Sequence, residues 1–144
     1  MPWKVPMNAI LYSIHHVLPL AVFGGLVLSL GAAFYGIFRK SKFTRGNRVL
    51  HLVTRVFLGV QSGVGLILYV LSGYPSAIGH SGKLFSPLGF LTIWHPGSMI
   101  AGTILINIGF QTSMKAVSDT QKHLRVAVSY GLGTLLICAG IPWS

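Results

Sequence analysis

Five of the six histidines stand in or beside apolar stretches, and they are the residues of this chain with the most chemistry to offer. They are His15, His16, His51, His95 and His123. An imidazole in hydrocarbon is costly, so its presence there indicates a partner. Paired imidazoles at one membrane depth are one way to hold a haem iron, whose axial ligands are often histidines. The alternative is that these histidines only cap helix ends.

The stretches that must position them indicate a membrane protein. The 144 residues are 52% hydrophobic and only 8% charged, with a mean hydropathy of +0.70 and a single acidic residue, Asp119. A soluble domain normally has about a quarter charged residues. So few polar side chains cannot cover a globule, and we therefore expect an integral membrane protein.

Four stretches reach the roughly 20 apolar residues that a membrane-spanning helix needs. They cover residues 9–38, 50–73, 89–112 and 123–141. The connections are short, which makes consecutive helices antiparallel neighbours. The sequence therefore predicts one all-α membrane domain over residues 1–144, a four-transmembrane-helix bundle with up-down-up-down topology.

Basic residues mark one side of this bundle. Nine of the eleven Lys and Arg residues lie in or next to the first and third connections, and only Lys4 and Lys83 lie on the other side. This positive-inside pattern predicts cytoplasmic basic loops and both termini outside, as in a bacterial inner membrane. The net charge of +10 then suits anionic lipid headgroups, and nucleic acid is not expected as a partner.

With this topology the histidines fall at two matched depths. At about 1.5 Å per residue, His16 and His95 lie roughly 9–10 Å below the outer end of the first and third helices. His51 and His123 both stand at the cytoplasmic starts of the second and fourth helices. Each pair is on diagonal helices and could hold one haem iron from both sides. Two haems would relay electrons between the leaflets.

Alternatives remain for several of these residues. His15 and His16 point about 100° apart on a helix, so at most one faces a given partner. Alignment with His95 favours His16 slightly, and His15 stays open. His51 and His123 also have an ordinary explanation as members of the basic cluster at helix starts, which makes the outer pair the stronger one.

Other residues could support such a site. Arg55, one turn after His51, could meet a haem propionate or serve only as a positive-inside anchor. Gln61, near mid-membrane, needs a hydrogen-bond partner, for which a neighbouring helix is the default and a quinone the alternative. Gly59 and Gly63 have the small-xxx-small spacing that allows close helix packing in lipid.

The stretch HPGSMIAG, residues 95–102, resembles the His-Pro-x-x-Met-x-x-Gly signature of transmembrane cytochrome b561 proteins. The resemblance implies a four-helix core with histidine pairs on alternate helices, two b-type haems and electron transfer across a membrane. It also implies that His95 is an axial ligand, whereas the other histidines follow from spacing and not from the motif. In that family the motif opens the first core helix, and here it lies on the third.

The sequence thus predicts a small membrane cytochrome b that binds one or two haems and relays electrons to a redox partner, a quinone or a larger complex. The alternative is a haem-free accessory subunit of a larger respiratory or photosynthetic complex. The expected iron ligands are His16, His95, His51 and His123, with His15 and Arg55 as further cofactor-binding residues. No nucleophile or nucleotide motif occurs, so any catalysis is expected only within an oxidoreductase complex.

Overall fold

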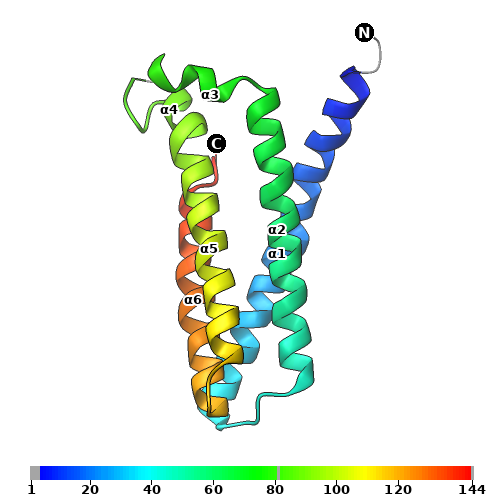
Figure 1. Ribbon diagram of the computed structural model, residues 1–144, viewed down its shortest axis with the longest axis vertical. Coiled ribbons are helices and arrows are strands. Elements are labelled where there is room, and N and C mark those ends of the chain that lie inside the picture. The colour runs from blue at the N-terminus through cyan, green and yellow to red at the C-terminus, as the bar shows by residue number, and fades with distance from the viewer. Residues whose placement is uncertain (1–3, 81, 144) are drawn as a thin grey trace.

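The computed structural model describes residues 4–80 and 82–143, and these contain helices and no strand. Residues 1–3, 81 and 144 of the predicted domain lie outside the described residues. The long helices are α1 (Lys4–Arg39), α2 (Arg45–Leu71), α5 (His95–Met114) and α6 (Asp119–Ala139). They lie side by side and alternate in direction (Figure 1). Between α2 and α5 come α3 (Tyr74–Ala77), a 3₁₀ turn (Ile78–His80), α4 (Pro87–Gly89) and a π-helical turn (Phe90–Trp94).

Capping residues decide where α2 and α6 begin. The Thr44 hydroxyl accepts a hydrogen bond from the Asn47 N–H, and the Asn47 side chain accepts one from the Thr44 N–H. Ser118 Oγ accepts a hydrogen bond from the Gln121 N–H in the same way at the start of α6. Each cap satisfies an N–H that has no partner inside its helix.

Both helices therefore begin before the apolar stretches that the sequence predicts at residues 50 and 123. His51 lies in the second turn of α2, and His123 is the fifth residue of α6. Neither histidine is the first residue of its helix, so each side chain can face the interior of the bundle.

Three helical stretches of the described chain are long and apolar enough to cross a membrane. They are Ala9–Arg39, Arg45–Leu71 and Pro87–Met114, the last of which runs from α4 through α5. α6 is not among them, because Lys122, His123 and Arg125 make its first turns polar. The expected all-helical fold is confirmed, together with three helices that could span a membrane.

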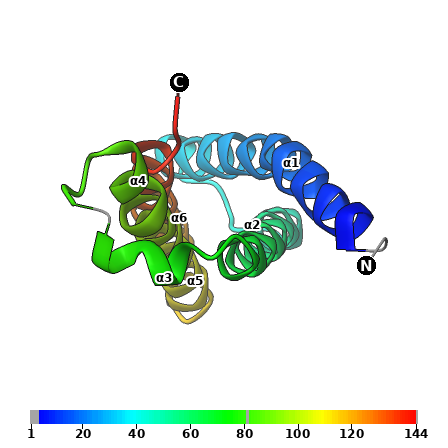
Figure 2. The same cartoon turned by 90° about the horizontal axis from the view of Figure 1, so that it is seen from above.

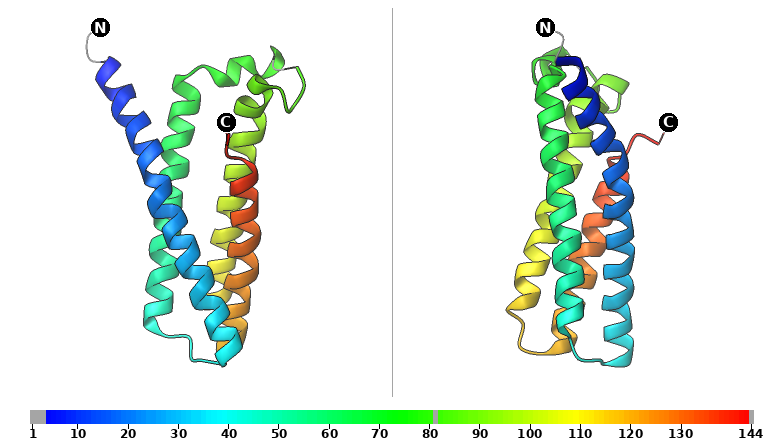
Figure 3. Two further views of the ribbon diagram at one scale, coloured as in Figure 1. Left: turned by 180° about the vertical axis from the view of Figure 1, so that it is seen from behind. Right: turned by 90° about the vertical axis from the view of Figure 1, so that its right-hand side faces the viewer.

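The helices pack in a ring whose neighbours are α1 and α2, α2 and α5, α5 and α6, and α6 and α1. α1 therefore lies opposite α5, and α2 lies opposite α6, as the view from above shows (Figure 2). The N-terminal part of α1 leans away from α5 and α6 (Figure 3). The buried core between the helices includes Leu26, Leu58, Ile106, Val126 and Tyr130.

α5 and α6 approach each other backbone to backbone through two glycines. A Cβ on Gly102 would lie 2.9 Å from the Gly133 carbonyl oxygen, and a Cβ on Gly133 would lie 3.0 Å from that of Gly102. At Gly59 and Gly63 a Cβ would meet no atom within 4 Å. The expectation that those two glycines mediate helix packing is therefore wrong within this chain.

Candidate functional site

Histidines gather at two levels of the bundle. The cavity cluster consists of His15 and His16 on α1 and His95 on α5, and the buried pair consists of His51 on α2 and His123 on α6. Each set therefore joins two opposite helices. His15 is level with Gly65 of α2, since a Cβ there would lie 2.9 Å from its imidazole. Gly65 is about 14 residues after His51, so the levels are roughly 21 Å apart along the helix.

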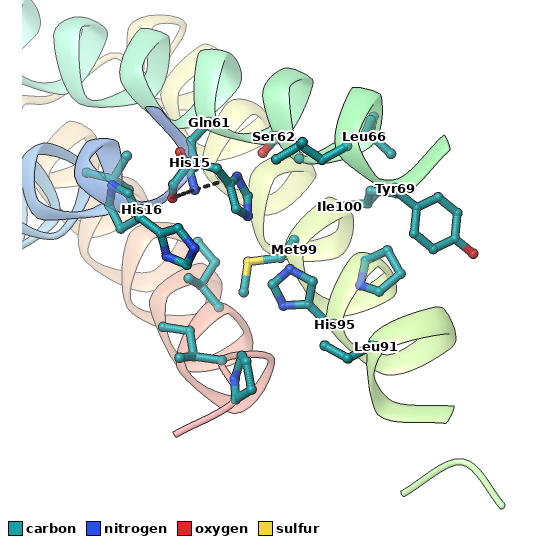
Figure 4. A pocket seen from close by; sticks show the side chains of 18 of the residues that line it. His15, His16, Gln61, Ser62, Leu66, Tyr69, Leu91, His95, Met99 and Ile100 are labelled. Atoms are coloured by element: carbon teal, nitrogen blue, oxygen red, sulfur yellow. Dashed lines mark hydrogen bonds between the residues drawn. The ribbon is translucent and has the colours of Figure 1, made fainter. Parts of the chain in front are cut away.

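The cavity cluster faces a cavity of about 410 Å³ between α1, α2, α5 and the end of α6. Figure 4 shows the imidazoles of His15, His16 and His95 around one shared space beside Met99. The remaining lining is mostly apolar and includes Leu58. Sites for small organic ligands have volumes of about 300–1,000 Å³ and combine an apolar lining with a few convergent polar groups. The cavity has both properties.

The imidazole of His95 is held by the C-terminal end of α6. Its Nδ1 lies 2.7 Å from the Gly140 carbonyl oxygen. A carbonyl oxygen only accepts, so Nδ1 carries the proton and donates. The indole Nε1 of Trp94 donates to the Ala139 carbonyl at 2.8 Å in the same way. Both bonds satisfy carbonyls at a helix end, where no N–H of the helix is available.

This bond leaves the lone pair of a neutral His95 ring on Nε2. Histidines that bind metal through Nε2 commonly donate their Nδ1–H to a backbone carbonyl, which fixes the tautomer and the ring orientation. The bond to Gly140 therefore leaves His95, which lines the cavity, in the tautomer whose Nε2 could bind a ligand.

His15 is the histidine that lies against His95. The two ring centroids are 6.4 Å apart, and the ring planes make an angle of 85°. Two imidazoles that bind one metal ion from opposite sides, with bonds of about 2 Å, have centroids about 6 Å apart. The ring of His16 lies 6.5 Å from that of His15, and its side chain is exposed. The structure thus brings His15, and not the favoured His16, into ring contact with His95.

Gln61 connects α2 to His15. Pro19 has no N–H, so the His15 carbonyl four residues earlier lacks its helical donor. Gln61 Nε2 donates to this carbonyl oxygen at 3.0 Å and also lies 3.0 Å from His15 Nδ1. The partner that the sequence requires for Gln61 is thus on a neighbouring helix.

Tyr69, two turns further along α2, makes a similar bond to the π-helical turn that precedes α5. Pro96 cannot donate to the Thr92 carbonyl, and the Tyr69 hydroxyl donates to that oxygen at 2.7 Å. Side chains of α2 therefore donate to backbone carbonyls of α1 and of the π-helical turn that precedes α5. In the sequence, only Pro19 and Pro96 indicate that these carbonyls need donors from another helix.

The buried pair has no exposed surface and no polar partner. His51 and His123 are both 0% exposed, and all four of their ring nitrogens lack a hydrogen-bond partner in the described part of the chain. The ring of Phe43 packs against both, at centroid distances of 5.7 Å and 5.0 Å. A buried polar group without a partner costs about 1–3 kcal/mol. The alternative that these two histidines join the basic cluster at the helix starts would have to account for their complete burial.

A glycine on the neighbouring helix makes room for one imidazole at each level. A Cβ on Gly36 of α1 would contact the ring carbons of His123. Gly65 of α2 has the same relation to His15. Each ring therefore lies directly against a helix backbone, in a place that any larger residue would fill.

Arg55 is a partly buried cation that makes no ion pair with any residue the structure describes. Its guanidinium carbon lies 4.6 Å from the centroid of the Phe110 ring. The only acidic side chain of the chain, Asp119, lies 3.9 Å from the ammonium of Lys122. Arg125, in contrast, donates to a backbone carbonyl of α5 at 2.6 Å. Of the two arginines near the buried pair, Arg55 is the one left to meet an acidic group.

No family model, curated protein or solved structure matches this chain. The resemblance of residues 95–102 to cytochrome b561 proteins therefore stays a prediction. Among the described residues, no group of three or more His, Cys, Asp or Glu side chains could hold a bare metal ion. Haem iron takes its remaining ligands from the porphyrin, so a pair of histidines is the number that it requires of a protein.

Proposed function

We propose that this chain is a membrane protein with four spanning helices that binds b-type haem between opposite helices and passes electrons within or across the membrane. The buried pair carries the proposal. Four imidazole nitrogens without a partner, on two fully buried side chains, call for a ligand. Axial ligation of one iron would engage one nitrogen of each ring. α6 would be the fourth span, with its charged first turns among the headgroups.

Haem could lie between the two histidines of the buried pair only if the Phe43 ring moved away. This ring packs against both imidazoles, so it must leave for haem to be held between His51 and His123. Phe43 lies in the connection between α1 and α2, outside any helix, so it can move without unwinding one. Arg55, one turn from His51, is the free cation for a propionate.

The cavity cluster supports a second haem. His95 would bind iron through Nε2, and His15 is its partner by ring separation, with His16 as the alternative. The cavity provides apolar surroundings, and the bond to Gly140 keeps His95 in the required tautomer. Here the three histidines already line a cavity of about 410 Å³.

Haem, when bound, supplies one-electron chemistry. The chain contributes the axial nitrogens, the exclusion of water by the core, and a fixed positive charge near the buried pair. With basic connections on the cytoplasmic side of a bacterial inner membrane, the two levels would relay electrons between the leaflets. The electron donor and acceptor would be a redox partner, a lipid-soluble quinone or subunits of a larger complex.

The test is a reduced-minus-oxidised spectrum, with haem counted per chain, of protein expressed with sufficient haem and purified in detergent. We expect the bands of bis-histidine b-type haem. His51→Ala and His123→Ala should remove the same haem, and His80→Ala, at an exposed residue of the 3₁₀ turn, should remove none. A featureless spectrum would contradict haem binding and would favour the haem-free accessory subunit.

A further inference from the structure

The side-chain amide of Gln61 donates to a carbonyl of α1 that lacks its helical hydrogen bond. Pro19 deprives the His15 carbonyl of its helical N–H, and Gln61 Nε2 donates to that carbonyl at 3.0 Å. The same Nε2 lies 3.0 Å from His15 Nδ1. Because an amide nitrogen only donates, Nδ1 is the acceptor in this contact, and both amide hydrogens are directed at one histidine.

This contact places the proton of a neutral His15 on Nε2. The tautomer is the opposite of that of His95, whose Nδ1 donates to a carbonyl and whose Nε2 is free. A histidine binds metal through a nitrogen without a proton. In the arrangement of the structure His15 is therefore a hydrogen-bond donor toward the cavity, and it becomes a ligand through Nε2 only if its proton resides on Nδ1.

The oxygen of the Gln61 amide could accept a hydrogen bond from His15 in the tautomer that is protonated on Nδ1. Gln61 Oε1 is buried and has no hydrogen-bond partner in the described part of the chain. Oε1 is therefore an acceptor that lacks a donor. If His15 bound iron through Nε2, the ring proton would be on Nδ1, which could donate it to Oε1. A partial turn of the amide that brings Oε1 to Nδ1 while Nε2 stays on the His15 carbonyl would satisfy both groups.

We infer that Gln61 is the positioning residue of the cavity site, which accepts the Nδ1–H of His15 and so selects His15 over His16 as the iron ligand opposite His95. The inference rests on the proposed function. His16 has a ring contact with His15 and no hydrogen-bond partner of this kind among the described residues. An acceptor at Nδ1 raises the basicity of the ligand nitrogen and favours ferric over ferrous iron.

The test separates this role from repair of the backbone. Pro19→Ala returns an N–H to the His15 carbonyl, so in that background Gln61→Leu removes only the bond to the ring. We expect the double variant to be close to Pro19→Ala in thermal stability, because it loses the bond to the ring but also the unpartnered Oε1. The midpoint potential of the haem that depends on His95 should rise by about 59 mV, a tenfold loss of preference for ferric iron. Asn107→Leu, which removes an amide bonded within its own helix, should leave the potential unchanged.

A second measurement needs no haem. The ¹⁵N shifts of the His15 ring in haem-free protein should show the proton on Nε2 in the wild type and a mixture of tautomers in Gln61→Leu.

The outcomes are distinguishable. Haem that is present and depends on His95, but whose potential is unaffected by Gln61→Leu, would overturn the inference and leave the proposed function standing. The same holds if the cavity haem survives His15→Ala and is lost in His16→Ala. A wild-type protein that binds no haem would overturn both.

Discussion

The Nδ1 of His95 donates a hydrogen bond of 2.7 Å to the carbonyl oxygen of Gly140, which joins the first turn of α5 to the residue that caps the C-terminal end of α6. The bond does two things at once. It satisfies a carbonyl at a helix end, and it fixes which ring nitrogen is free for a ligand. The adjacent Trp94 makes only the first kind of bond, to Ala139. Mutation of Trp94 and of His95 can therefore separate the bond to the end of α6 from the choice of the free imidazole nitrogen.

We expect His95→Ala to abolish haem in the cavity and Trp94→Phe to retain it. Each variant loses one bond to the end of α6, so each should lower the free energy of unfolding by about 1 kcal/mol. Haem per chain and thermal unfolding in detergent measure the two effects. Equal loss of haem in both variants would mean that fraying of α6, and not a missing ligand, empties the site.

At the buried pair, the effect of His123→Leu on the free energy of unfolding should have opposite signs without and with haem. In haem-free protein, His123→Leu replaces an imidazole with two unpartnered nitrogens by an apolar side chain, and we expect it to raise the free energy of unfolding by about 1 kcal/mol or more. In haem-loaded protein the same change removes a ligand and should destabilise. Chemical unfolding with and without haem measures both. A variant that is destabilised in both states would show that the imidazole packs better than its missing partners suggest.

The helical fold and the two levels at which the histidines gather follow from the sequence, because long apolar stretches and short connections leave few alternatives. The complete burial of His51 and His123 does not, because their place beside basic residues near the helix starts equally suits an exposed position. The choice between His15 and His16 depends on Gln61, which an apolar pattern does not connect to Pro19. The sequence also predicts a fourth span over residues 123–141 from its apolar length, but Lys122, His123 and Arg125 make the first turns of α6 too polar for that helix to be counted among the candidate spans.

Gly36 allows a matched test of the space around His123. An alanine stabilises an exposed helix position by about 1 kcal/mol over glycine. We expect Gly31→Ala, where a Cβ would meet nothing within 4 Å, to be neutral or stabilising. Gly36→Ala would place its Cβ against the His123 ring, so it should destabilise the protein and reduce haem at the buried pair. Thermal unfolding and haem content measure both. Equal behaviour of the two variants would contradict the close contact between α1 and this imidazole.

Phe43 tests whether the buried pair is closed by its own chain. Its ring packs against both imidazoles, and the Lys122 ammonium lies 5.8 Å from the ring centroid. If the ring must leave before haem is held there, Phe43→Ala removes a competitor, and we expect haem affinity to rise about tenfold, the equivalent of 1.4 kcal/mol. Titration of haem into the His95→Ala protein isolates this site. Phe38→Ala, at a side chain 80% exposed, is the control and should leave the affinity unchanged. A fall in haem affinity would instead mean that Phe43 packs on the bound haem. Removal of a ring that blocks haem raises the affinity, whereas removal of a ring that supports haem lowers it.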